Sequence, residues 1–186
     1  MTENTSLPER RSIRIRGYDY TQGNAYYITV CVDNRKCILC DEKEGVISRN
    51  KYGNIVHEEI LRTEKVRENI QIIECIVMPN HFHAVVFIKE NTSEKIKGAL
   101  AGKIKHFHPA SAPARLESGS IGAITGQIKS ITTKLIRKAG MHDFEWQRNY
   151  YEHIVRDEED LYNIRQYIIN NPLKWKEDEY NPNKAK

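Results

Sequence analysis

Two histidines set two positions apart are the residues whose type and spacing most directly suggest chemistry. They are His81 and His83, within the string C-I-V-M-P-N-H-F-H-A-V-V at 75–86. Both follow a Pro-Asn turn and open an apolar, β-branched run, so the local pattern predicts a strand–turn–strand unit. Side chains two residues apart on a strand point to the same face. Such a pair can form half of a metal site, or it can be two polar residues on a solvated sheet face.

A second polar set lies near the end of the chain, on a predicted helix that begins after Asp157 and ends at Pro172. The core stripe of this helix is Leu161, Ile164 and Ile168. Beside it, a polar stripe contains Asp160, Asn163, Tyr167 and Asn171. A tyrosine and an amide one turn apart can face one site. The alternative is a half-buried tyrosine with its hydroxyl at the surface.

The elements that would position these residues alternate between strands and helices. Strands are predicted at 26–32, 37–39, 45–48 and 70–78, and the segment 146–155 runs into another. In the first strand, Ile28, Val30 and Val32 share one face, and Tyr27, Thr29 and Cys31 share the other.

Two further helices are predicted from apolar residues that recur at helical spacing. The helix at 52–67 has the apolar stripe Val56, Ile60 and Leu61, with Glu58, Glu59, Arg62, Glu64 and Lys65 facing water. The helix between Ser120 as N-cap and Gly140 as C-terminal cap has the stripe Ile121, Ile124, Ile128, Ile131 and Leu135. Its basic residues Lys129, Lys134, Arg137 and Lys138 are expected to be exposed.

Length and composition indicate one globular domain of 186 residues, with 29% charged and 39% apolar residues. No apolar run approaches the ~20 residues that span a bilayer, and the polar N-terminus does not resemble a signal peptide, so a cytoplasmic protein without a membrane partner is expected. Four reduced cysteines suit that compartment. Cys37 and Cys40 have C-x-x-C spacing, but no second pair completes a zinc site, so we expect them to fill apolar space.

Basic residues are unevenly distributed along the chain. Four arginines lie in the first sixteen residues: Arg10, Arg11, Arg14 and Arg16. The segment from Lys95 to Lys138 contains nine Lys or Arg residues and a single acidic residue, Glu117. This asymmetry is typical of a nucleic-acid-binding protein, although ordinary surface charge explains any single member. We therefore divide the chain into a basic arm at 1–16, one domain at 17–176 and a polar tail at 177–186. A flexible insertion is expected at about 89–119, because no periodic pattern continues there.

The string V-M-P-N-H-F-H at 77–83 resembles the HUH motif (His, large hydrophobic residue, His) of single-tyrosine HUH transposases. The whole chain is similar to the REP-associated tyrosine transposases within that superfamily. The supporting segments, in order, are G-Y-D-Y at 17–20, A-Y-Y-I-T-V at 25–30, W-Q-R at 146–148, H-I-V-R-D at 153–157 and Y-I-I-N-N-P at 167–172. These segments lie in order across roughly residues 16–175, nearly the whole chain, and the stretch 89–119 has no pattern that matches.

The resemblance implies an α+β fold, with an antiparallel sheet backed by helices, of the ferredoxin-like or RRM-like HUH endonuclease kind. It implies that His81 and His83 hold a divalent ion, Mg²⁺ or Mn²⁺, and that Tyr167 is the nucleophile. Asn171 corresponds to a position that can complete the metal shell. Attack on a phosphodiester would leave a 5′-phosphotyrosine and a free 3′-hydroxyl, which favours strand transfer over hydrolysis.

The expected substrate is single-stranded DNA beside a hairpin, because a tyrosine on a small open sheet attacks one strand. The four arginines of the arm at 1–16 and the basic residues of the helix that follows Ser120 would bind the DNA phosphates. Aromatic residues that can stack on bases, or pack in the interior instead, are Tyr18, Tyr20, Trp146, Tyr150 and Tyr151. Glu152 and His153 either assist proton transfer or pack as ordinary strand residues. Both a monomer and a homodimer remain open.

Two other functions compete with the transposase reading. The first is a domesticated protein that binds DNA hairpins without catalysis, and the retention of both histidines and the tyrosine weighs against it. The second is a nucleotide hydrolase of the H-x-H-x-H kind, which Val85 excludes by standing where the third histidine belongs.

Overall fold

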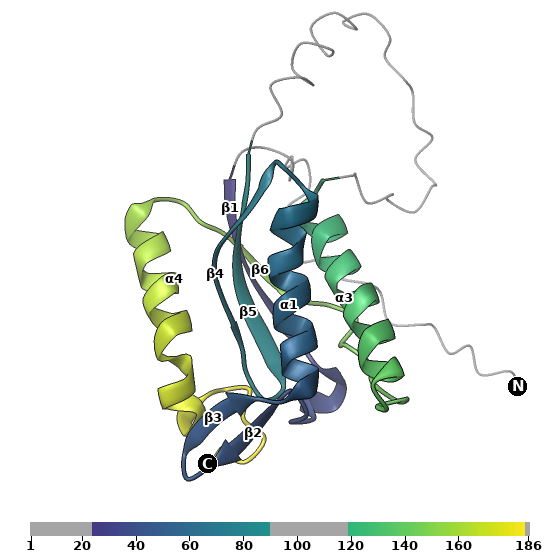
Figure 1. Ribbon diagram of the computed structural model, residues 1–186. Coiled ribbons are helices and arrows are strands. Elements are labelled where there is room, and N and C mark those ends of the chain that lie inside the picture. The colour runs from purple at the N-terminus through teal and green to yellow at the C-terminus, as the bar shows by residue number, and fades with distance from the viewer. Residues whose placement is uncertain (1–23, 90–118, 185–186) are drawn as a thin grey trace, which may run out of the picture.

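A four-stranded antiparallel sheet forms the centre of the computed structural model, which describes residues 24–89 and 119–184 (Figure 1). Its strands are β1 (Asn24–Cys31), β4 (Ile70–Val77), β5 (His81–Ile88) and β6 (Tyr151–Ile154). Their order across the sheet is β4-β5-β1-β6, and every neighbouring pair is antiparallel. The predicted hairpin at 70–88 is therefore confirmed, and it supplies one edge and one central strand.

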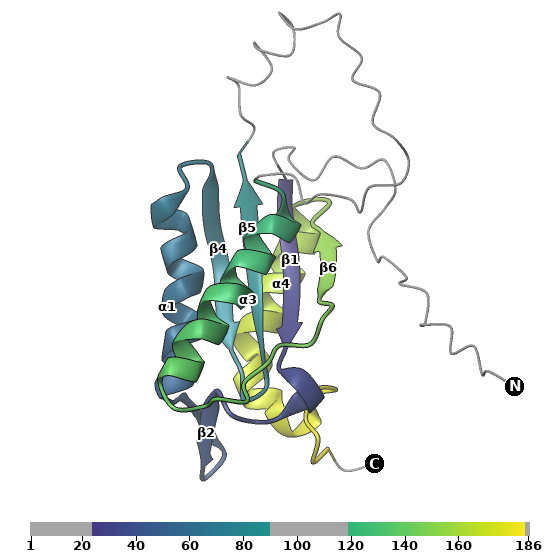
Figure 2. The same ribbon diagram turned by 90° about the vertical axis from the view of Figure 1, so that its right-hand side faces the viewer.

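Helices cover both faces of this sheet. Helix α1 (Lys51–Val66) and helix α3 (Ile121–Lys138) lie together on one face, and helix α4 (Glu158–Asn170) lies alone on the other (Figures 1 and 2). Without α4 and the small hairpin at 40–49, the chain runs β-α-β-β-α-β, which is the ferredoxin-like arrangement. The predicted α+β fold with an antiparallel sheet backed by helices is confirmed.

The pleat of the two central strands sorts their side chains between the two faces. On β1 and β5, the alternate residues Tyr26, Ile28, Val30, Phe82, Ala84 and Val86 join the main hydrophobic core beneath α1 and α3. Tyr27 and Val85 instead pack with Ile168 of α4. His81 and His83 share the parity of Val85, so the same alternation that builds the core turns both imidazoles toward α4.

The turn between β4 and β5 is held by backbone hydrogen bonds on both sides. The amide of Val32 donates to the Asn80 carbonyl at 2.8 Å, and the amides of Ile38 and Leu39 both donate to the Pro79 carbonyl at 2.9 Å. The turn that precedes the histidines is thus fixed to the segment that follows β1.

A separate small hairpin contains β2 (Cys40–Lys43) and β3 (Val46–Arg49). Its turn uses Glu44 at φ 52° and Gly45 at φ 80°, the left-handed pair that a tight two-residue hairpin needs. The strand predicted at 37–39 is wrong, because the strand of this region begins at Cys40. The amides of Ile38 and Leu39 donate to the Pro79 carbonyl rather than to a partner strand.

Helix α1 begins after Asn50, whose side chain accepts from the amides of Tyr52 and Gly53. Val56 and Ile60 are buried as predicted, but Leu61 is 38% exposed and Glu59 only 5% exposed. The predicted places of those two residues are wrong. Glu59 lies beside the buried stripe and pairs its carboxylate with the Arg62 guanidinium at 3.2 Å, which makes its burial tolerable.

Helix α3 begins after Ser120, whose hydroxyl accepts from the Ala123 amide. Its first three isoleucines are buried as predicted, but the C-terminal half turns a different side inward: Ile136 is buried, whereas Leu135 is 42% exposed. Thr132, also buried, donates to the Ile128 carbonyl and accepts from the Trp146 indole. These bonds allow a hydroxyl to take the core position predicted for Ile131. The chain leaves the helix through Gly140 at φ 110°.

Helix α4 begins after Asp157, whose carboxylate accepts from the Asp160 amide at 2.8 Å, as predicted for an N-cap. Its inward stripe packs on the sheet through Leu161, Ile164 and Ile168. The chain continues into a short 3₁₀ helix, η2 (Asn171–Glu177), and an earlier one, η1 (Asp33–Arg35), follows β1. Among the described residues, no helix has the length and apolar character needed to cross a membrane.

Candidate active site

The two histidines of β5 meet on the sheet face that α4 covers. Both side chains are fully buried, and their Nε2 atoms lie 2.9 Å apart. The imidazoles therefore present their ring nitrogens to a common point rather than to solvent.

Asn80 fixes the orientation of His81. Its amide nitrogen donates to the backbone carbonyls of Arg35 at 3.1 Å and Tyr180 at 2.7 Å, so its oxygen must be the atom that faces His81. That oxygen lies 2.8 Å from Nδ1 of His81 and accepts its proton. The Nε2 atom of His81 therefore carries a lone pair, which accepts a hydrogen bond from Nε2 of His83 at 2.9 Å.

Hydroxyl groups of β1 hold His83 in the same way. Its Nδ1 atom lies 2.9 Å from the Tyr27 hydroxyl and 2.9 Å from the Thr29 hydroxyl. Thr29 stands directly opposite His83 in the strand register, which brings the two side chains together. Because a hydroxyl can donate or accept, these partners satisfy either tautomer of the imidazole.

Burial keeps both imidazoles neutral. It lowers the pKa of His83 to about 3, and burial together with the neighbouring His83 holds the pKa of His81 well below its usual range. Neutral imidazole is the form that coordinates a metal.

Tyr167 approaches this pair from α4. Its ring centroid lies 5.3 Å from that of His83, and the side chain is 43% exposed. Burial of the ring, followed by the nearby charges of Asp178 and Glu179, raises the pKa of Tyr167 to about 12, although a side-chain hydrogen bond with Asn171 opposes the shift. The hydroxyl is therefore protonated in the free protein at neutral pH.

Asn171 lies at the end of α4, one turn beyond Tyr167, and is only 3% exposed. Within the described residues its side-chain oxygen is buried without a hydrogen-bond partner. Such an oxygen costs free energy unless something that the structure does not contain satisfies it. A cation is one partner that such an amide oxygen can bind, and Asn171 lines a hollow together with Tyr167.

The donor set fits a divalent ion. At bond lengths of about 2.1 Å, two ligands at a right angle in octahedral geometry stand about 3 Å apart. The Nε2 atoms of His81 and His83 lie 2.9 Å apart. Nowhere in 24–89 and 119–184 do three His, Cys, Asp or Glu side chains gather to hold a metal. Two imidazoles and one amide would thus leave further coordination positions for substrate oxygen or water.

The C-terminal segment forms one wall of the site. The ring of Tyr180 lies 4.7 Å from that of His81 and 6.2 Å from that of His83. Arg35 holds this segment by donating to the Glu179 carbonyl at 2.9 Å, with its guanidinium 5.2 Å from the centre of the Tyr180 ring. The sequence predicted only a polar tail at 177–186, but residues 177–184 contribute directly to the site.

Two hollows open on either side of Tyr167. The first has a volume of about 600 Å³ and is lined by Tyr27, Thr29, Tyr151, Asn163, Ile164, Tyr167, Glu179 and Tyr180. The second, of about 480 Å³, lies toward Asn171, with Gln166, Asn170 and Lys174 among its lining residues. The polar stripe predicted on α4 is therefore reflected in these hollows: Asn163 lines the first and Asn171 lines the second, each together with Tyr167.

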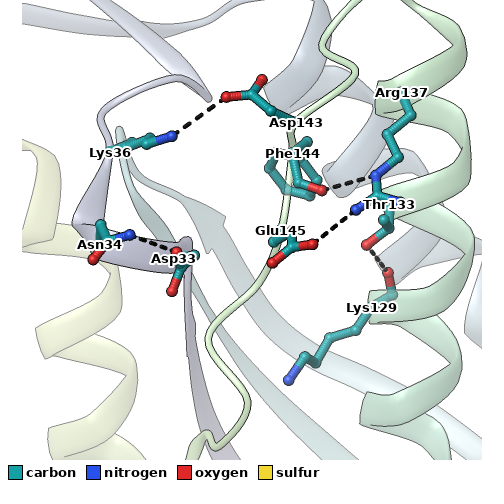
Figure 3. Close-up of polar contacts among 9 residues, drawn as sticks. All are labelled: Asp33, Asn34, Lys36, Lys129, Thr133, Arg137, Asp143, Phe144 and Glu145. Carbon is teal, nitrogen blue, oxygen red and sulfur yellow. Dashed lines mark hydrogen bonds and ion pairs between the residues drawn. The ribbon is translucent and has the colours of Figure 1, made fainter.

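The basic helix does not contribute to this site, because α3 lies on the opposite face of the sheet (Figures 1 and 2). Lys129 was predicted to be an exposed lysine, but its ammonium group donates to the carbonyls of Gln147 at 2.6 Å and Arg148 at 3.0 Å. Arg137 donates to the Phe144 carbonyl and pairs with Glu145 at 3.1 Å (Figure 3). Lys134 and Lys138 are exposed, on that same helix.

Other predicted site residues also lie elsewhere or outside the described residues. His153 pairs with Asp160 at 2.8 Å, and Glu152 accepts from the Tyr150 hydroxyl, so neither lines the hollows beside Tyr167. Trp146 is buried in the core and does not present a ring for stacking. The predicted arginine arm (Arg10, Arg11, Arg14 and Arg16), Tyr18, Tyr20 and nearly all of the insertion lie outside the described residues.

Known proteins resemble this chain in sequence and in fold. An uncharacterized protein of Haemophilus influenzae is 33% identical over 176 residues, which cover 95% of each chain. A predicted REP-associated tyrosine transposase of the same organism is 24% identical over 157 residues, or 84% of this chain and 74% of that one. A solved REP-associated tyrosine transposase bound to a REP hairpin aligns with a TM-score of 0.57 and 19% identity, over 88% of this chain and 74% of that one.

The chain has the fold of a REP-associated tyrosine transposase. It belongs to the same family as the uncharacterized Haemophilus influenzae protein, although no family model matches the sequence. The resemblance predicted from the HUH string and the tyrosine helix is confirmed.

Within this transposase fold, sequence reasoning missed the residues that support the histidines and cover them. Tyr27 and Thr29 were placed on one face of β1, but their contacts with His83 were not predicted. Thr29 stands opposite His83 and Tyr27 opposite Val85, and this pairing register is a tertiary property. Asn80 was read only as a turn residue. Tyr180 carried no periodic signal, since it lies in irregular chain beyond the last helix.

Proposed function

We propose that this protein nicks single-stranded DNA and transfers the strand, in a metal-dependent reaction with Tyr167 as the nucleophile. The observation that carries the proposal is the approach of the Tyr167 ring to within 5.3 Å of His83, whose Nε2 atom in turn lies 2.9 Å from that of His81. A nucleophile beside a pair of neutral imidazoles is an arrangement suited to metal-assisted phosphoryl transfer.

The covalent step would join the Tyr167 oxygen to phosphorus and break the bond from phosphorus to the 3′ oxygen. The tyrosine proton leaves to water, and the departing 3′ oxygen gains a proton to become a hydroxyl. The products are a 5′-phosphotyrosine and a free 3′ end. One phosphodiester is replaced by another, so a second 3′-hydroxyl can reverse the reaction elsewhere without ATP.

His81, His83 and Asn171 are the residues that would hold Mg²⁺ or Mn²⁺. When bound there, such an ion would polarise a non-bridging phosphate oxygen and orient the scissile phosphate. Asn80, Thr29 and Tyr27 keep the two imidazoles in place from behind. Helix α4 and its C-cap hold Tyr167 and Asn171 one turn apart, and both side chains line the same hollow.

The proposed substrate is DNA that carries a hairpin beside a single-stranded flank. Support comes from the solved relative, which is bound to a REP hairpin. The arginine arm at 10–16 would contribute phosphate contacts, and the exposed Lys134 and Lys138 would do so only for DNA that reaches the α3 face. An enzyme with this substrate would work in the cytoplasm, where the chromosome is.

The test is to incubate the protein with Mn²⁺ and a pool of labelled hairpin oligonucleotides with randomised single-stranded flanks. We expect a covalent protein–DNA adduct that survives denaturing electrophoresis. Tyr167→Phe should abolish it, because that change removes only the attacking oxygen. Tyr162→Phe is the matched control, since Tyr162 is an exposed tyrosine on the same helix that does not line either hollow.

A second variant separates the metal role from DNA binding. His81→Ala should lose the adduct while retaining binding to the hairpin. If wild-type protein binds hairpins but forms no adduct with Mg²⁺ or Mn²⁺, the catalytic proposal is wrong and a binding protein without catalysis is the correct reading. An adduct that persists in Tyr167→Phe would also contradict the proposal.

A further inference from the structure

The larger hollow beside Tyr167 has an aromatic lining, of which the proposed chemistry uses only part. Three tyrosines besides Tyr167 line it, namely Tyr27, Tyr151 and Tyr180, and its volume of about 600 Å³ lies in the range of ligand pockets. The phosphodiester chemistry needs the histidines and one tyrosine hydroxyl. Because Tyr27 holds His83 and Tyr180 packs against His81, Tyr151 is the aromatic ring of this hollow that has no role in that chemistry.

Tyr151 is the ring most available to such a ligand. It is 52% exposed, although its ring lies only 6.0 Å from that of Tyr27 in an edge-on arrangement. An edge-on contact leaves one face of an aromatic ring open. β6 is also the edge strand of the sheet, so within the described part of the chain no strand pairs with it beyond Tyr151.

Asn163 supplies a polar group to the same hollow. It stands one turn before Tyr167 on α4 and lines the hollow together with it. Within 24–89 and 119–184 its side chain makes no hydrogen bond, so its amide can both donate and accept toward a ligand. A flat aromatic wall with one free amide matches a nucleobase, which has a π-face and a hydrogen-bonding edge.

We propose that this hollow binds an unpaired nucleobase of the attacked strand, next to the cleaved phosphodiester, by stacking on Tyr151 and hydrogen bonding to Asn163. The inference rests on the proposed function, because it takes the strand past Tyr167. A base enters such a pocket only when it has left its helical stack, so the ligand is a nucleotide of the single-stranded flank. The pocket thereby contributes both affinity and the choice of cleavage position.

The experiment is an abasic scan of binding, carried out in the Tyr167→Phe protein so that no cleavage occurs. Each flank position of the hairpin oligonucleotide is replaced in turn by an abasic site, and Kd is measured for each. One or two positions should weaken binding by about 10- to 100-fold, the effect of losing one base–aromatic stack. Adding Tyr151→Ala should remove the penalty at those positions only.

Tyr162→Ala is the matched control, because Tyr162 is similarly exposed at 62% but does not line the hollow. It should leave the abasic penalty unchanged, and Asn163→Ala should reduce that penalty at the same positions. A uniform abasic profile, or a profile that Tyr151→Ala does not alter, would overturn the pocket. Absence of adduct in wild-type protein would instead refute the nicking proposal, and the binding scan would still decide the pocket.

Discussion

The two faces of the central sheet show how one pair of strands can serve stability and chemistry at once. Beneath α1 and α3, the alternate residues of β1 and β5 form a hydrophobic core that includes Phe82 and Val86. Beneath α4, the intervening residues include His81, His83 and Thr29, all buried and all hydrogen-bonded. Adjacent residues on one strand therefore carry different functions, and the rigid core face fixes the position of the polar face.

The comparison predicts that substitutions on the core face change stability, whereas substitutions on the α4 face change activity. Phe82→Ala should lower the free energy of unfolding by about 3–5 kcal/mol, because the ring is fully buried against Trp146. Tyr167→Phe should change it by less than about 0.5 kcal/mol, since only a hydroxyl on a half-exposed side chain is removed. Urea unfolding measures both, and an equal loss in the two variants would contradict the division.

Neighbouring residues of α3 sharpen the boundary of the core face. Ile136→Ala should cost about 2–5 kcal/mol of unfolding free energy, because Ile136 is fully buried. Leu135→Ala should cost less than about 0.5 kcal/mol, because Leu135 is 42% exposed. Urea unfolding of the two variants distinguishes them. A larger loss in Leu135→Ala than in Ile136→Ala would support the buried stripe predicted from the sequence instead.

Loss of the α4 cap tests how strongly the α4 face depends on its helix. Asp157→Ala should lower the free energy of unfolding by about 1 kcal/mol, because the Asp160 amide loses its acceptor. Hydrogen exchange should accelerate in the first turn of α4 and remain unchanged in α1. Acceleration spread equally over both helices would show that α4 is not a separately anchored element.

The smallest effect concerns the hydrogen bond between His153 of β6 and Asp160 of α4. A hydrogen bond with His153 lowers the pKa of Asp160 below its ordinary value. The stabilisation that it gives is therefore present above the unfolded pKa and is lost as the pH falls through the lower folded pKa. Asp160→Asn should flatten the acid limb of a stability–pH curve below pH ~4. An unchanged limb in the variant would exclude this carboxylate as a contributor.

The sequence alone predicted the structure correctly where side-chain periodicity and local turn or cap residues agree. The alternation around His81 and His83 predicted a strand with both imidazoles on one face, and Asp157 and Pro172 bracketed the tyrosine helix correctly. Leu161 and Ile168 then predicted which side of that helix packs on the sheet, which left Tyr167 near the polar edge.

Features that depend on pairs of distant residues could not be predicted in this way. A buried Thr132 requires a partner such as Trp146, which no pattern within the helix reveals. The wall formed by Tyr180 depends on contacts with Arg35 and Asn80, far away in the chain. Lysines at helical spacing predicted a DNA-binding surface, but charge pattern alone does not say which sheet face a helix covers or that Lys129 is engaged by backbone carbonyls.

Peptide mapping of the covalent adduct tests the central claim most directly, because four tyrosines line the hollow beside the histidines. Trypsin separates the relevant ones: Tyr167 lies in the peptide 166–174, Tyr151 in 149–156 and Tyr180 in 177–184. After reaction and nuclease digestion, mass spectrometry should find the nucleotide remnant on Tyr167 alone. A remnant on Tyr27, Tyr151 or Tyr180 would contradict the assignment of α4 as the element that delivers the nucleophile.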